Sequence, residues 1–177
     1  MDFLRYTRDL NIRLAQLNNV DLGYELGENK ASSGVPRASL ESLGLISASP
    51  SLLALYEHVG SVSAPDLWNG IFLLPAEDAH AKHGRTLPSS WRKPNGDTAS
   101  VFVFGTDGGG NMLSIDDRET VWFLPLGEMR NGVYHEGKRA VTRLGTMEEF
   151  LHALLKDIEK FVEGDREHPF IGRLMST

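Results

Sequence analysis

The segment that most restricts the possible folds is a pair of strongly β-forming stretches joined by a glycine-rich turn. Residues 99–104 are Ala-Ser-Val-Phe-Val-Phe, and residues 112–115 begin a second apolar stretch. Val and Phe suit the pleated, half-buried surface of a sheet. The glycines of residues 105–111 tolerate the positive φ that a tight turn requires, and Asp107 and Asn111 hydrogen-bond locally in turns. Together these residues predict two consecutive strands in a mostly antiparallel sheet.

A capped amphipathic helix is predicted over residues 146–164. Thr146 and Glu149 match the Thr-x-x-Glu capping box, in which each side chain satisfies an otherwise unpaired backbone N–H group at the start of the helix. Apolar residues then recur at helical spacing and form one broad stripe up to Gly164. They are Met147, Phe150, Leu151, Leu154, Leu155, Ile158, Phe161 and Val162.

The same reasoning divides the rest of the chain into shorter elements. Further helices are predicted at residues 3–20, 50–59 and 76–83. Further strands are predicted at residues 71–74, 121–124 and 138–144. Glycine, proline and serine mark loops or turns at residues 23–39, 87–97 and 127–132. The first of these loops is interpreted as a linker, with the preceding helix as a loosely attached arm. Residues 165–177 are interpreted as a tail.

Length and composition indicate a single soluble domain over residues 1–177. With 41% hydrophobic and 24% charged residues, the chain has the composition of an ordinary globular protein. It has no cysteine, which excludes disulfides, thiolate metal sites and cysteine nucleophiles. The first residues lack a basic patch followed by an apolar run, and no apolar stretch approaches the roughly 18 residues of a membrane span. We therefore expect a cytoplasmic protein without membrane association.

The charge balance bears on the kind of partner. Eighteen basic residues against 24 acidic residues give a net charge of −6, which argues against nucleic acid and permits a basic partner. Residues 148–167 contain seven acids and three bases, so this stretch contributes −4 to the net charge. We interpret the stretch as a solvated helix face, because long surface helices are commonly charged for solubility.

The glycine-rich turn does not fit the common nucleotide and calcium motifs. It has the glycine spacing of a phosphate-binding loop, but Asn111 and Met112 stand where that loop needs Lys and then Ser or Thr. Leu113 stands where the dinucleotide fingerprint needs its third glycine. A calcium loop beginning at Asp107 would need Glu at its twelfth position, which is Arg118. No cofactor is predicted.

No catalytic or metal-binding constellation emerges from the sequence either. His80 and His83 lie three residues apart on a predicted helix, with Glu77 and Asp78 nearby, so a shared metal is the alternative to ordinary histidines. His135 is followed by Glu, but the second histidine of a metalloprotease helix is missing. There is no Gly-x-Ser-x-Gly elbow, and no nucleophile can be matched with a base and an acid. We predict no catalytic residue, no metal and no enzyme activity.

The candidate binding residues lie in and around the glycine-rich turn. Asp107 and Asn111 belong to the turn, and Asp116, Asp117 and Glu119 follow the second strand. These acids and Asp107 form a candidate acidic rim for a protein partner. A solvated turn is the alternative interpretation of the acids.

Two tryptophans complete the set of candidates. Trp68 and Trp91 lie beside turn residues, where a large rigid aromatic side chain is either an exposed binding anchor or part of the edge of the core. The sequence leaves both interpretations open. Trp122 lies within a predicted strand and is expected in the core.

Three segments taken together carry a family resemblance. Residues 50–73, residues 103–116 with the run Gly-Thr-Asp-Gly-Gly-Gly-Asn-Met-Leu-Ser-Ile-Asp, and residues 147–151 resemble the SUKH superfamily, whose founding members are the Smi/Knr cell-wall regulators. The similarity covers residues 40–164. Members often have Leu-Pro before the early helix, whereas this chain has Ala48-Ser49-Pro50. The helix at 3–20 and the tail at 165–177 lie outside the match.

The resemblance implies an α+β domain with a twisted, mainly antiparallel sheet and helices packed beside it. It also implies a binding protein, because many bacterial members resemble immunity proteins that neutralise toxins, often nucleases. An acidic inhibitor would reach a basic toxin faster through electrostatic steering. The leading hypothesis is therefore a toxin-neutralising protein that forms a stoichiometric complex. A regulatory or scaffold module of the same fold is the first alternative, and an enzyme or small-ligand domain that uses residues 107–117 is the second.

Overall fold

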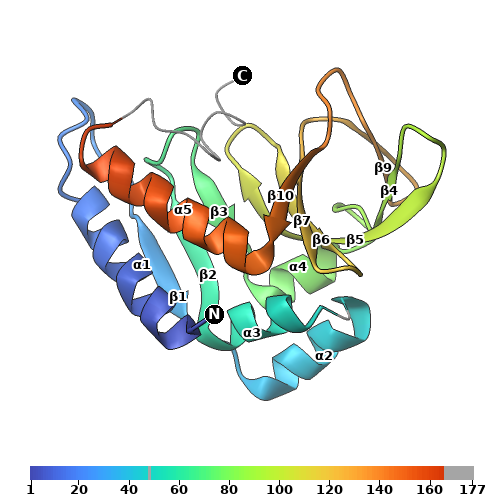
Figure 1. Ribbon diagram of the computed structural model, residues 1–177, viewed down its shortest axis with the longest axis horizontal. Coiled ribbons are helices and arrows are strands. Elements are labelled where there is room, and N and C mark those ends of the chain that lie inside the picture. Colours follow the sequence, from blue (N-terminus) through green and yellow to red (C-terminus); the bar gives the residue numbers. More distant parts are fainter. Residues whose placement is uncertain (48, 166–177) are drawn as a thin grey trace.

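The computed structural model describes residues 1–47 and 49–165, which form five helices and ten strands (Figure 1). The helices are α1 (Phe3–Leu17), α2 (Arg37–Ser47), α3 (Pro50–His58), α4 (Ala76–Lys82) and α5 (Met147–Val162). The strands are β1 (Lys30–Ser33), β2 (Val59–Ala64), β3 (Ile71–Leu73), β4 (Ser90–Arg92), β5 (Thr98–Asp107), β6 (Met112–Asp116), β7 (Thr120–Leu124), β8 (Glu128–Arg130), β9 (Val133–His135) and β10 (Thr142–Thr146).

The strands form an open sheet that branches at the long strand β5. One path runs β1-β2-β3-β5-β4-β9-β8, and a second leads from β5 through β6 and β7 to β10. The start of β5 pairs with β4, its end pairs with β3, and β6 pairs with it from Val101 to Thr106. All these pairs are antiparallel except β4 with β9. The predicted α+β fold with a mainly antiparallel sheet is therefore confirmed.

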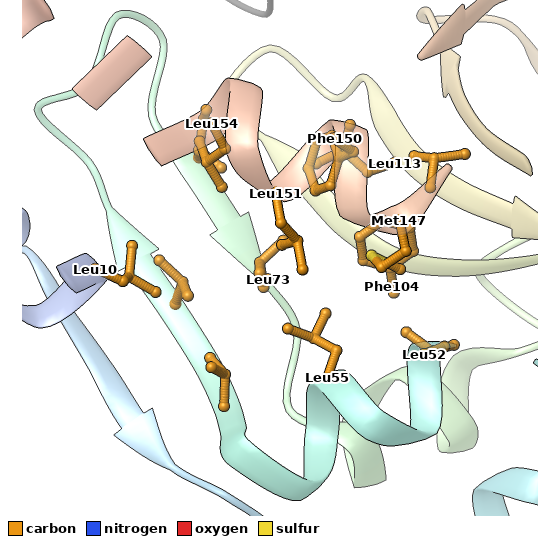
Figure 2. Packing of buried hydrophobic residues seen from close by; sticks show 14 of the residues in the cluster. Leu10, Leu52, Leu55, Leu73, Phe104, Leu113, Met147, Phe150, Leu151 and Leu154 are labelled. Atoms are coloured by element: carbon orange, nitrogen blue, oxygen red, sulfur yellow. The ribbon is translucent and has the colours of Figure 1, made fainter. Parts of the chain in front are cut away.

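The main core lies between the sheet and the helices α1, α3 and α5. In Figure 2, Leu55 of α3 and Leu151 of α5 point into the same interior, next to Leu73 of β3. The rings of Phe104 in β5 and Phe150 in α5 meet edge to face, with 5.7 Å between their centroids. Helix α5 thus buries its apolar stripe against the middle of the sheet.

A second, smaller cluster lies where β5, β4, β9 and β7 meet. Its buried members are Trp91, Val101, Leu124 and Tyr134. The hydroxyl of Tyr134 donates a 2.7 Å hydrogen bond to the carbonyl of Pro125. This cluster therefore holds the backbone at Pro125, the residue that directly follows β7.

Helices α3 and α5 begin with the caps that the sequence predicts. The Ser49 side chain accepts a hydrogen bond from the N–H of Leu52, and Pro50 occupies the first turn of α3. At α5 both halves of the capping box are present between Thr146 and Glu149. These two predictions are confirmed by the structure.

The N-terminal helix is confirmed, but its interpretation as a loosely attached arm is wrong. Tyr6, Leu10, Leu14 and Leu17 of α1 are buried in the main core. Their spacing of three and four places them all on one helix face, and that face packs beside α5 (Figure 1). Burying four large side chains attaches α1 firmly to the domain.

The linker predicted at residues 23–39 is also wrong, because it contains β1 and the start of α2. A buried polar cluster holds this segment. The Asn29 side chain donates to Oδ2 of Asp66 at 2.6 Å, and both the backbone and the side chain of Asn29 donate to Oδ1 of Asn18. The N–H of Gly27 donates to Asp66 as well. Asn29, one of the polar residues that led to the loop prediction, thus anchors this segment to the rest of the domain.

Three other predicted boundaries need correction. The loop predicted at 87–97 contains β4, and the turn at 127–132 contains β8. The strand predicted at 138–144 begins only at Thr142. The tail predicted at 165–177 lies outside the described residues except for Asp165. Within the ranges the structure describes, no helix has both the length and the apolar character needed to cross a membrane.

The capping box leads to a prediction about pH. Hydrogen bonds from the backbone and side chain of Thr146 hold the pKa of Glu149 below its ordinary value of 4.5. A lowered folded-state pKa stabilises the fold above the unfolded-state pKa, and this stabilisation is lost as the pH falls through the folded-state pKa. We expect Glu149→Gln to reduce the free energy of unfolding near neutral pH, with the difference from wild type shrinking below about pH 4.5.

Urea unfolding at several pH values measures this difference. The control is Asp117→Asn, because Asp117 is exposed and accepts no hydrogen bond within the described part of the chain. A Glu149→Gln difference that stays constant from pH 7 down to about pH 3 would show that the carboxylate charge does not stabilise the helix.

Candidate functional site

The glycine-rich turn between β5 and β6 is organised around a buried carboxylate. Oδ1 of Asp107 accepts hydrogen bonds from the N–H groups of Gly109 (2.9 Å) and Asn111 (2.8 Å). Oδ2 accepts a 2.6 Å bond from the Asn111 side chain. Asp107 and Asn111 are each only 5% exposed. Their side chains therefore bind each other and the turn backbone, and they fix the shape of the turn.

Two neighbouring turns hold the glycine-rich turn in place. The N–H of Gly108 donates to the carbonyl of Asn69 at 2.9 Å, and the approach is so close that a Cβ at position 108 would collide with that oxygen. On the other side, Oδ1 of Asn111 accepts a 2.8 Å bond from the N–H of Leu126. The glycines of residues 108–110 are exposed above these contacts. The structure therefore requires glycine at position 108 for the close approach to Asn69.

Leu126 is the prominent side chain beside this turn, and it is 70% exposed. Its own N–H is held by Asn111, and the preceding carbonyl, that of Pro125, is held by Tyr134. On its other side, Gly127 lies so close to the carbonyl of His135 and the ring of Tyr134 that no side chain would fit. The backbone on both sides of Leu126 is thus fixed, and its side chain is presented outward.

Asp116, at the far end of the same hairpin, acts within the protein. Its Oδ1 accepts from the N–H groups of Arg118 (3.0 Å) and Thr120 (2.9 Å), and its Oδ2 accepts from Nε1 of Trp122 (2.9 Å). Asp116 therefore closes the turn between β6 and β7 and orients a tryptophan. Asp117, the next residue, is exposed.

Glu119 joins this β6–β7 turn to the start of α3. Its backbone has φ +62°, a left-handed conformation that is uncommon for a residue with a side chain. Its Oε2 accepts a 3.1 Å bond from the N–H of Ser51 and a further bond from the Ser51 hydroxyl. An acid at this position also complements the positive end of the helix dipole. Glu119 therefore stabilises the helix start.

The acidic rim that the sequence suggests is not one surface. Asp107 lies at the end of β5, beside β3, whereas Asp116 pairs with Val101 near the other end of the hairpin. The five residues of β6 separate the two turns by roughly 13 Å at ~3.3 Å per residue. Asp107 is also buried. The rim hypothesis is wrong because the acids lie at opposite ends of one strand pair.

The tryptophans also differ in their surroundings. Trp91 is 6% exposed and packs in the smaller cluster, with its ring centroid 5.1 Å from that of Trp122. Trp68 is partly buried at the edge of the main core, with φ +52° and an edge-to-face contact with Phe161. Of the two, only Trp68 is next in sequence to a residue that contacts the glycine-rich turn, since the carbonyl of Asn69 accepts from the N–H of Gly108.

His80 of α4 and His83, the residue that follows this helix, show no metal geometry. The ring of His83 stacks on Phe102, 5.0 Å between centroids, and burial lowers the pKa of this imidazole. Among the residues described, no group of three His, Cys, Asp or Glu side chains is placed to hold a metal ion.

The sequence analysis missed Leu126 and Tyr134, which complete the site. Leu126 lies in a Pro-Leu-Gly run, and a bulky apolar residue between two turn-forming residues is a signal for an exposed position. No comparable signal marks the bond from Tyr134 to Pro125. Comparison with known proteins adds no relative, since no protein-family model and no curated protein matches this chain.

Proposed function

We propose that the protein is a non-enzymatic binding domain that neutralises a basic toxin in the cytoplasm by forming a stoichiometric complex, as immunity proteins of the SUKH superfamily do. The observation that carries the proposal is the rigid, exposed surface formed by Gly108–Gly110 and Leu126, which we call the turn surface. The resemblance at residues 103–116 falls on the same segment. The net charge of −6 adds electrostatic attraction to a basic partner.

Rigidity is what makes the turn surface suitable for tight binding. Association is opposed by the entropy lost when side chains and loops become ordered at an interface. Here the buried Asp107 and Asn111 already fix the backbone of the turn, and Asn111 and Tyr134 already fix the backbone around Leu126. A partner would therefore bind a surface that is ordered before contact.

The electrostatic part of the proposal has its own test. Asp117 is exposed and accepts no hydrogen bond in the described part of the chain, so Asp117→Lys changes charge without breaking a contact. We expect this variant to slow association with the toxin about threefold at low ionic strength and to have almost no effect near 1 M salt, where the Debye length is ~3 Å. Asp117→Asn should give about half that effect in free energy. A loss of equal size at both salt concentrations would instead place Asp117 in the contact.

The whole proposal is tested by capture and by survival. The tagged protein is isolated from its own cells with washes at low and then high salt, and the retained proteins are identified by mass spectrometry. We expect one dominant partner at equal stoichiometry, and we expect co-expression to protect cells from that partner. Survival without complex formation would overturn the proposal. Several weak, salt-labile partners would favour the regulatory or scaffold module.

A further inference from the structure

We infer that the turn surface recognises an arginine or lysine side chain of the partner together with an apolar pocket that receives Leu126. This inference rests on the proposed binding function and specifies the chemistry of its partner. It follows from three properties of the turn surface: the polarity of its exposed backbone groups, the charge buried beneath it, and the fixed apolar side chain at its margin.

The exposed backbone of the turn offers acceptors and no donors. The N–H of Gly108 is bound to Asn69, that of Gly109 to the Asp107 carboxylate, and that of Gly110 to the Asp107 carbonyl at 3.4 Å. No hydrogen bond within residues 1–47 and 49–165 ends on the carbonyl oxygens of these three glycines. A partner that hydrogen-bonds here must therefore supply donors, and Arg and Lys side chains are donors only.

The charge beneath these carbonyls has the sign that attracts a cation. The Asp107 carboxylate is bonded only to neutral groups, the N–H groups of Gly109 and Asn111 and the side-chain amide of Asn111. It takes part in none of the ion pairs found in the described chain. A charge surrounded by protein is screened less than one in water, so its field reaches the surface across a layer of glycine backbone.

Leu126 adds an apolar contact to this cation site. A Cβ at Gly110 would lie 3.5 Å from Cδ1 of Leu126, so the side chain borders the glycine backbone directly. Burying the Leu126 side chain in a pocket of the partner removes its apolar surface from water, which favours association by roughly 1.5–3 kcal/mol, or at least about tenfold in affinity. The aliphatic stem of the arginine or lysine can form one wall of this pocket while its charged end reaches the glycine carbonyls. The surface therefore fits a basic and partly apolar patch.

The cation site can be tested on the isolated protein by NMR. The probes are Nα-acetyl-arginine amide and its neutral analogue, Nα-acetyl-citrulline amide, titrated into ¹⁵N-labelled protein. We expect saturable shifts of the amide signals of Gly108–Gly110 and Leu126 with the arginine probe, with a dissociation constant on the order of 1 mM. The citrulline probe should give shifts at least about fivefold weaker. Shifts spread over the surface, or equal shifts with both probes, would overturn the inference.

The apolar contact is tested with the captured partner. Leu126→Ala is expected to weaken binding at least about tenfold, because it removes most of the apolar area that the pocket buries. Leu4→Ala is the matched control, because Leu4 of α1 is 74% exposed, and its binding should change less than about twofold. If both variants bind an equimolar partner like wild type, the inference fails and the proposed function stands. If the arginine probe maps to the turn but no equimolar partner exists, the proposed function fails instead.

Discussion

Asp107→Ala is expected to lower the free energy of unfolding by about 3 kcal/mol, measured by urea unfolding. The substitution removes the acceptor of three hydrogen bonds and leaves the backbone N–H and side-chain amide of Asn111 without that partner in a buried environment. Each buried donor left unsatisfied costs about 1–3 kcal/mol. Since Asn111 also accepts from Leu126, the loss spreads to the segment after β7.

Asp117→Ala is the matched control for this prediction, because it removes an exposed aspartate of the same hairpin. It should change the free energy of unfolding by less than about 0.5 kcal/mol.

Comparison of Asp107→Ala with Asp117→Ala also tests the alternative in which residues 107–117 bind a small ligand or substrate. That alternative predicts that Asp107→Ala abolishes turnover or ligand binding while the fold survives. A stable Asp107→Ala variant would contradict the structural role given to this carboxylate.

Phe150→Ala is expected to destabilise the protein by about 4 kcal/mol, because the substitution opens a cavity at the centre of the main core. Phe150 is fully buried and meets Phe104 edge to face. Figure 2 shows it on the side of α5 that faces the sheet. Loss of Phe150 therefore removes a contact between α5 and β5, which are distant in sequence.

The same urea experiment checks this value. Lys156→Ala serves as the control on the same helix, because Lys156 is exposed and alanine favours helix formation. The control should change the free energy of unfolding by less than about 0.5 kcal/mol, with an unchanged dependence on urea. An equal, small effect of both substitutions would mean that α5 contributes to stability through its exposed face rather than its apolar stripe.

The elements that sequence analysis found are those whose own residues determine their structure. Helix α5 carries its cap and its stripe within one segment, and β5 is rich in Val and Phe. Among the strands that the sequence did not predict, β1 and β8 are short and polar, with the sequences Lys-Ala-Ser-Ser and Glu-Met-Arg. Such segments become strands because a distant partner offers backbone groups for pairing, as β2 does for β1. One-dimensional patterns do not contain that information.

Only part of the candidate site was predicted, because the rest of it also depends on segments that are distant along the chain. The local bonds of Asp107 and Asn111 follow from residue types that favour turns, and the sequence shows them. The contacts that hold the turn in place come from Asn69 and Leu126, which are distant from it along the chain. The proposed rim failed because adjacency in sequence does not show at which end of a strand pair a residue lies.

The two ends of the sheet's longest path offer little to a strand from another molecule. An open sheet exposes unpaired backbone groups along its outermost strands, and those groups can recruit a strand from another molecule. In the longest path of this sheet the outermost strands are β1 and β8, of four and three residues. β1 begins with Lys30, and in β8 Glu128 and Arg130 pair with each other at 2.7 Å. Growth of fibres by strand addition at these edges would have few bonds to gain and charged side chains to accommodate.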